Sequence, residues 1–139
     1  MIVKTLDNHE VKWQLKSTGK KISKLHQRAI EVIQGTLPGV HILQEVAIPV
    51  RKGKKLYLDV YLLKQMVAIE IMGAQHGKRV KHFQTSDQFR KQVDNDGLKA
   101  MWCQVNNIPL IYFEHDETEQ IWRAKLLNVL FPGLHIPTE

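Results

Sequence analysis

Alternating hydrophobic and polar positions, rich in β-branched residues, predict six short strands. The first two, at residues 2–6 and 11–15, are joined by Asp7 and Asn8, which are favoured turn residues, so they predict an N-terminal hairpin. Three more runs follow in close order, at residues 42–50, 55–62 and 66–72. Their short connectors predict a three-stranded antiparallel meander. The last strand is predicted at residues 109–113.

Three other segments show the three- and four-residue spacing of amphipathic helices. Ser23 is placed to cap the first helix, which ends near Gly35 or Pro38. Ser86 is placed to cap the second helix, which runs to residue 106, and the third covers residues 118–130. The stretch between the meander and the second helix, residues 73–85, has no clear period and is predicted to be a basic loop.

The order of these elements predicts an α/β protein. At 139 residues the chain is close to the usual size of one domain, so we expect a single folding unit. Residues 1–19 would form the N-terminal hairpin. Residues 20–113 would form a core of helix, three-stranded antiparallel meander, helix and strand. Residues 114–139 would form a C-terminal helix and tail.

The strand pattern brings two acids together. In a β-hairpin, the numbers of directly opposed residues sum to a constant. If the second turn of the meander centres on Lys64 and Gln65, Asp59 faces Glu70. The same register pairs aliphatic residues on the other face, Leu58 with Ile71, Val60 with Ile69 and Leu62 with Val67. Directly opposed carboxylates destabilise each other, so this pair needs a compensating cation or a proton, and a divalent metal ion is the obvious candidate.

A third acid can extend this row. If the preceding turn centres on Lys52, Glu45 faces Asp59. The accompanying pairs are Val46 with Leu58 and Ile48 with Leu56. A bulge at Gly53 would shift this register by one and remove Glu45 from the row. The acids could equally form the solvent side of an exposed antiparallel sheet, where they need no special role.

Charge and cysteine content limit the range of possible functions and partners. Twenty Lys and Arg against 14 Asp and Glu leave a net charge of +6, which favours a phosphate-bearing partner, although a solubilising surface gives the same total. Cys103 is the only cysteine, so no internal disulfide can form, and we expect it to be buried. No histidine pairs with a cysteine at zinc-ligand spacing. With no signal-peptide pattern and no 18 consecutive apolar residues, no membrane association is expected.

Two basic clusters flank the acids and are expected to bind nucleic-acid phosphates. Their members are Arg51, Lys52, Lys54 and Lys55 at the first meander turn, and Lys78, Arg79 and Lys81 in the loop. Tyr57 and Tyr61 share the face of Asp59, where they could stack on a base or pack beneath a helix. Trp102 and Trp122 fall among apolar helix neighbours and are predicted to be core residues.

These residues resemble a known family. The sequence LYLDVYL at residues 56–62 and the sequence VAIEIMGAQH at residues 67–76 are similar to the core of PD-(D/E)xK endonucleases. The similarity is closest to very-short-patch repair endonucleases and related phage and homing nucleases. In that branch an acid-bearing strand precedes an acidic strand ending at glycine, a histidine, and a helix with an Asp and a basic residue. The resemblance covers residues 23–113 and implies a restriction-endonuclease-like fold.

The resemblance implies roles for individual residues. Asp59 and Glu70 would bind Mg²⁺ or Mn²⁺, with the Ile71 carbonyl as a further ligand. His76 would orient water or protonate the leaving oxygen. Asp96 and Lys99 on the second helix would complete the catalytic site, although they could instead form a simple surface ion pair.

One position departs from the family pattern. The third signature residue, usually Lys or a second acid, is Met72 here, and Gln75, His76 or Lys99 are candidates to replace it. Family members often carry an acid in the first helix. The corresponding position here is that of Glu31 or, in the best alignment, that of His26. Glu31 falls on the polar side of the predicted helix, where a solvated glutamate is also expected.

The sequence therefore predicts a metal-dependent DNA endonuclease in the cytoplasm of a bacterium or a phage-infected host cell. A homodimer would cut both strands most easily. Two alternatives stay open. One is a nucleic-acid-binding protein on the same fold that has lost activity through Met72, and the other is a protein-interaction or inhibitor module.

Overall fold

A four-stranded mixed sheet forms the centre of the protein. The computed structural model describes residues 1–19, 21–74 and 86–134, and its larger sheet has the strand order β3-β4-β5-β6. The bounds are Ile42–Arg51 for β3, Lys54–Leu62 for β4, Val67–Met72 for β5 and Leu110–Glu114 for β6. Strands β3, β4 and β5 are antiparallel neighbours, and β6 runs parallel to β5. The predicted meander and further strand are therefore confirmed.

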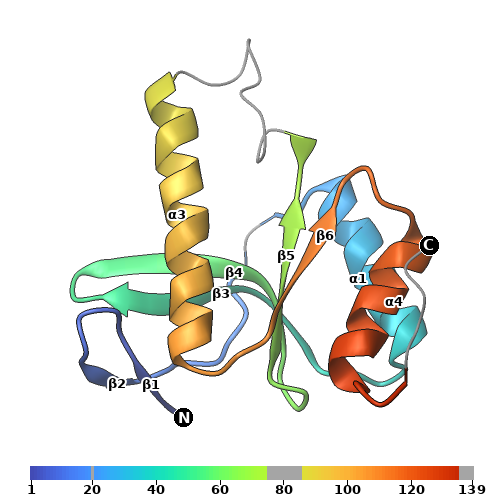
Figure 1. Ribbon diagram of the computed structural model, residues 1–139, viewed down its shortest axis with the longest axis horizontal. Coiled ribbons are helices and arrows are strands. Elements are labelled where there is room, and N and C mark those ends of the chain that lie inside the picture. Colours follow the sequence, from blue (N-terminus) through green and yellow to red (C-terminus); the bar gives the residue numbers. More distant parts are fainter. Residues whose placement is uncertain (20, 75–85, 135–139) are drawn as a thin grey trace.

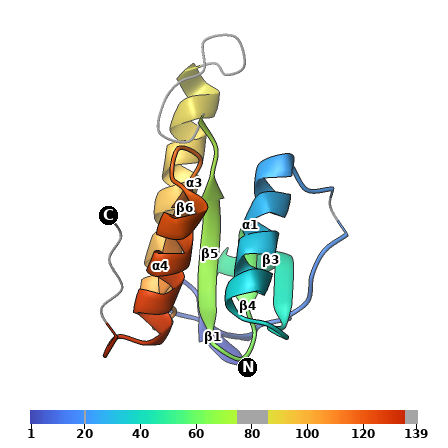
Figure 2. The ribbon, with the colours of Figure 1, turned by 90° about the vertical axis from the view of Figure 1, so that its right-hand side faces the viewer.

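Helices lie on both sides of this sheet. Their bounds are Lys24–Thr36 for α1, Ser86–Val105 for α3 and Glu119–Leu130 for α4. Figures 1 and 2 both show α3 on one side of β5 and α1 on the other. The predicted cap of α1 is confirmed, because the Ser23 hydroxyl accepts a hydrogen bond from the His26 N–H. None of the described helices combines the length and the apolar character needed to cross a membrane.

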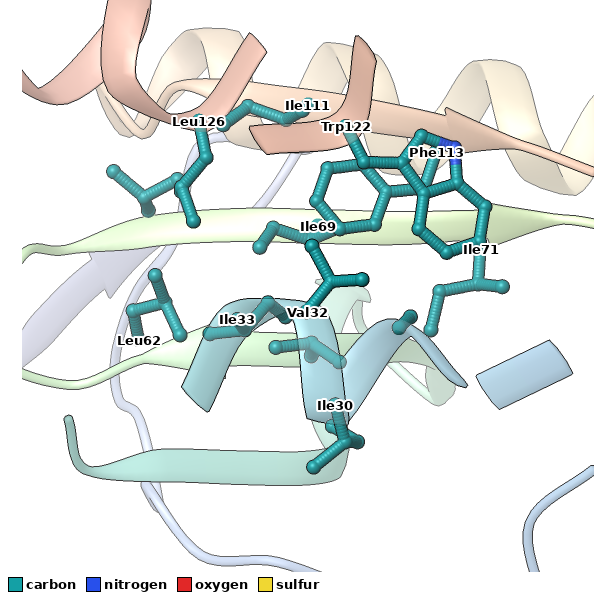
Figure 3. Packing of buried hydrophobic residues seen from close by; sticks show 13 residues of the cluster. Ile30, Val32, Ile33, Leu62, Ile69, Ile71, Ile111, Phe113, Trp122 and Leu126 are labelled. Atoms are coloured by element: carbon teal, nitrogen blue, oxygen red, sulfur yellow. The ribbon is translucent and has the colours of Figure 1, made fainter. Parts of the chain in front are cut away.

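One hydrophobic core lies between α1, α4 and the strands (Figure 3). Phe113 of β6 stacks on Trp122 of α4, with ring centroids 4.8 Å apart and planes 5° from parallel. Ile33 of α1 and Ile69 of β5 are fully buried in the same core. Trp122 is thus a core residue, as predicted, and the packing fixes α1 and α4 against the central strands.

The N-terminal hairpin is anchored by Trp13. Its strands β1 (Ile2–Lys4) and β2 (Glu10–Lys12) are shorter than predicted, because the turn around Asn8 begins at Thr5 and ends at His9. Trp13, directly after β2, is 3% exposed, and its Nε1–H donates to the Ala47 carbonyl of β3 at 2.8 Å. This contact ties the hairpin to the edge strand of the larger sheet.

A second core covers the opposite face of the sheet. Tyr61 of β4 and Ala68 of β5 are completely buried there with Trp102 and Cys103 of α3. The alternative interpretation of an exposed solvent face is therefore wrong, because α3 and Trp13 cover it. Of the two alternatives for Tyr61, packing beneath a helix is confirmed and base stacking is excluded, and the predicted burial of Trp102 and Cys103 is confirmed.

Candidate metal-binding and catalytic site

Asp59 and Glu70 are joined where the ladder between β4 and β5 ends. The ladder pairs Val60 with Ile69 and Leu62 with Val67, which confirms the predicted register. Beyond it, the Asp59 N–H donates to Glu70 Oε2 and the Ile71 N–H donates to Asp59 Oδ2, both at 2.7 Å. The predicted pairing of Leu58 with Ile71 is therefore wrong, because the two carboxylates take the place of backbone acceptors.

Glu70 is a buried acid with a cationic partner. Glu70 is only 3% exposed, and the Nζ of Lys99, on α3, lies 2.7 Å from the Glu70 Oε1. Burial raises the pKa of Glu70 to about 7, and the neighbouring Asp59 carboxylate acts in the same direction, whereas Lys99 opposes both. Glu70 can therefore exchange a proton near neutral pH.

Lys99 comes from α3 rather than from the strand that carries Glu70. Burial alone would lower the pKa of Lys99, but the charge and hydrogen bond of Glu70, with smaller contributions from Asp59 and Asp96, raise it above its usual value. The Lys99 side chain is 15% exposed. Its ion pair with Glu70 agrees with the prediction that this stripe of α3 faces the carboxylates, and does not agree with the alternative of a simple surface pair. Lys99 thus places a charged ammonium beside the acids, whereas the signature position holds the uncharged Met72.

A second group of ligand atoms lies on the other side of Asp59. One ligand atom each from His26, Glu45 and Asp59 lies within 4.8 Å of the other two. The His26 Nδ1 is 4.0 Å from the Glu45 Oε1. The structure thus brings Glu45 into the row of acids, and it places His26 of α1 there too.

The register of β3 and β4 explains how Glu45 reaches this position. The predicted pairs of Val46 with Leu58 and Ile48 with Leu56 are present, and the predicted irregularity beside Gly53 begins only beyond Pro49. The shift therefore does not remove Glu45 from the row. Glu45 itself has a φ of 50°, which is strained for a residue with a side chain and interrupts the ladder opposite Asp59.

His26, Glu45 and Asp59 line a pocket of about 520 Å³. Its wall includes Lys21 from the segment before α1, His26 of α1, Asp59 of β4, Ile71 near the end of β5, and His115. His115, which sequence reasoning missed, follows β6, and its N–H donates to the Met72 carbonyl at 2.9 Å. The carboxyl ends of neighbouring parallel strands meet at one sheet edge. The strand predicted directly before His115 could therefore have indicated that His115 lies beside the end of β5.

Other predicted site residues lie elsewhere. Glu31 is exposed on α1 and lies five residues from His26, about 140° around the helix axis, so it does not join the acids. Five predicted residues lie outside the described part of the chain, namely Gln75, His76, Lys78, Arg79 and Lys81.

The first basic cluster lies at the tip of the β3–β4 hairpin. Arg51, Lys52 and Lys55 are exposed and Lys54 is half-buried. The hairpin tip and β2 line a hollow of about 740 Å³. Lys54 is five strand residues from Asp59, which corresponds to about 16 Å along β4. The cluster is therefore a separate arm, not a part of the acidic pocket.

Comparisons with known proteins leave the family open. No family model and no solved structure matches the chain. One similar sequence is "Uncharacterized protein 307L" of Invertebrate iridescent virus 6, which is 40% identical over 68 residues. The match covers 45% of this chain and 34% of the viral protein, so it spans about a third of that relative's length. The printed name attributes no activity to the viral protein.

Proposed function

We propose that the protein is a Mg²⁺- or Mn²⁺-dependent endonuclease that hydrolyses DNA phosphodiester bonds on a restriction-endonuclease-like core. The observation that carries this proposal is the joining of Asp59 to Glu70 across neighbouring strands, with Lys99 2.7 Å from Glu70. The element order α1, β3, β4, β5, α3, β6 supports it, because the family resemblance implies that order.

The donor atoms fit a hard divalent cation. Asp59 and Glu70 offer carboxylate oxygens and Ile71 a backbone carbonyl, the ligand types that Mg²⁺ and Mn²⁺ prefer. Each carboxylate oxygen has two lone pairs, so its hydrogen bond leaves room for a metal ligand bond. When bound, the ion would polarise a phosphoryl oxygen and activate a water molecule.

The chain's own residues would then orient the substrate and balance charge. Lys99 favours the ionised form of Glu70, and its ammonium would stabilise negative charge that develops on a phosphate. In this role Lys99 would replace the basic residue that the family usually has at the signature position, which is occupied by Met72 here. The arm of Arg51, Lys52 and Lys55 would hold the DNA backbone about five base pairs from the acids, given a distance of about 16 Å along β4.

Cleavage of linear, single-stranded and branched DNA with Mg²⁺, Mn²⁺ or chelator tests the proposal. We expect metal-dependent cutting that is lost in Asp59→Ala and Glu70→Ala and retained in Glu31→Gln, a matched exposed acid of α1. DNA binding without cutting in every metal would instead support a binding protein. Absence of both would support the protein-interaction module.

A further inference from the structure

We infer that His26, Glu45 and Asp59 form a transition-metal site, which binds Mn²⁺, Co²⁺ or Zn²⁺ in preference to Mg²⁺. The inference rests on the proposed function only in that Asp59 is shared with the proposed catalytic site. It assigns a nitrogen ligand and a different ion preference to this pocket.

The geometry of the three side chains is close to that of a bound ion. Their ligand atoms lie within 4.8 Å of one another. Ligand atoms bound to one ion at about 2.0–2.2 Å are at most about 4.4 Å apart. Three ligand atoms cannot all lie opposite one another, and neighbouring ones are about 3.0–3.5 Å apart, so side-chain movements of about an ångström would complete the site. The two carboxylates match the charge of a divalent cation.

His26 supplies an independent indication of a ligand. It is 4% exposed, lines the pocket, and its Nε2 is buried without a hydrogen-bond partner among the described residues. A buried imidazole nitrogen normally has a hydrogen-bond partner, because leaving it unsatisfied destabilises the folded state. At 4.0 Å, the approach of His26 Nδ1 to Glu45 is also too long for a hydrogen bond.

Imidazole decides the ion preference. Mg²⁺ strongly prefers oxygen ligands, whereas imidazole nitrogen suits later first-row ions, whose affinities rise from Mn²⁺ towards Cu²⁺. The acids Asp59 and Glu70 do not discriminate in this way, because both offer only oxygen. His26 is therefore the residue that would set the preference.

Spectroscopy of the Mn²⁺-loaded full chain tests the inference without relying on activity. Pulsed electron paramagnetic resonance of the wild type should show a ¹⁴N coupling to Mn²⁺, and His26→Gln should lose it. In competition titrations, His26→Gln should weaken Mn²⁺ binding by about tenfold or more while Mg²⁺ binding changes less. The control Glu31→Gln, on the same helix, should change neither.

Absence of the ¹⁴N coupling in the wild type would overturn the inference, and this measurement holds even where His26→Gln does not fold. Equal Mn²⁺ affinities of wild type and folded His26→Gln would also overturn it. Either result would leave the proposed nuclease intact if cutting still depended on Asp59 and Glu70. Conversely, a nitrogen-ligated Mn²⁺ in a protein that cuts no DNA would support the metal site and contradict the nuclease.

Discussion

Lys99 of α3 and Glu70 of β5 form a buried ion pair, with the Nζ 2.7 Å from the Oε1. The two residues are 29 positions apart in the sequence, and the pair joins the helix covering one face of the sheet to the strand that carries the acid. Because removal of one member leaves a buried charge without its partner, this contact allows a direct test of the site.

Replacing Lys99 by Met should destabilise the metal-free protein most at high pH. At pH 8 Glu70 is largely ionised, and loss of its partner should cost about 3 kcal/mol of unfolding free energy. At pH 5 the loss should be much smaller, because Glu70 is then protonated. Urea unfolding in chelator measures both values. Lys91→Met, at an exposed position of α3, should change stability by less than about 0.5 kcal/mol, and equal losses in Lys99→Met at the two pH values would contradict the account.

The raised pKa of Glu70 predicts a pH dependence of stability. The folded protein holds this proton up to about pH 7, whereas the ordinary value is 4.5. The stabilisation is therefore fully present below pH 4.5 and is lost as the pH rises through 7, with a total of about 3 kcal/mol. Glu70→Gln should abolish that part of the wild-type slope between pH 4.5 and 7. Parallel stability curves for the two proteins, measured in chelator, would show that Glu70 does not titrate in this range.

The basic arm should contribute affinity for DNA but no metal binding. The double substitution Lys52→Ala and Lys55→Ala should weaken DNA binding and reduce the slope of log affinity against log salt by about 1 per lysine. Lys64→Ala is the matched control, since Lys64 is exposed beyond the opposite end of β4. Fluorescence anisotropy across a salt series measures both. An unchanged slope in the double variant would remove the arm from the DNA interface.

Local patterns predicted much of the fold. The constant sum of opposed residue numbers across the turn at Lys64 predicted that Val60 pairs with Ile69 and that Asp59 lies beside Glu70. This register was favoured because it places the aliphatic residues on one face. The Ser23 cap was predicted for a similar reason, since its hydroxyl satisfies an N–H of its own helix.

Long-range packing was less accessible to sequence reasoning. Trp13 packs edge-on against Tyr61 and Trp102, with ring centroids 4.8 and 5.1 Å away, and it closes a face that β4 and β5 alone leave open. The partner of Lys99 was likewise undecided, because helical spacing relates it to Asp96 while only the docking of α3 brings it to Glu70. The positive φ of Glu45 had no signal in the sequence.

Asp59 is central to this account, since it is hydrogen-bonded to Glu70 and its ligand atom lies within 4.8 Å of those of His26 and Glu45. The most direct test measures DNA cutting in Mn²⁺ and DNA binding in chelator with the same preparations of wild type and Asp59→Asn. The account predicts that cutting falls by at least about a hundredfold, while binding in chelator is maintained or strengthened because a negative charge is removed. Wild-type cutting rates in folded Asp59→Asn would contradict it.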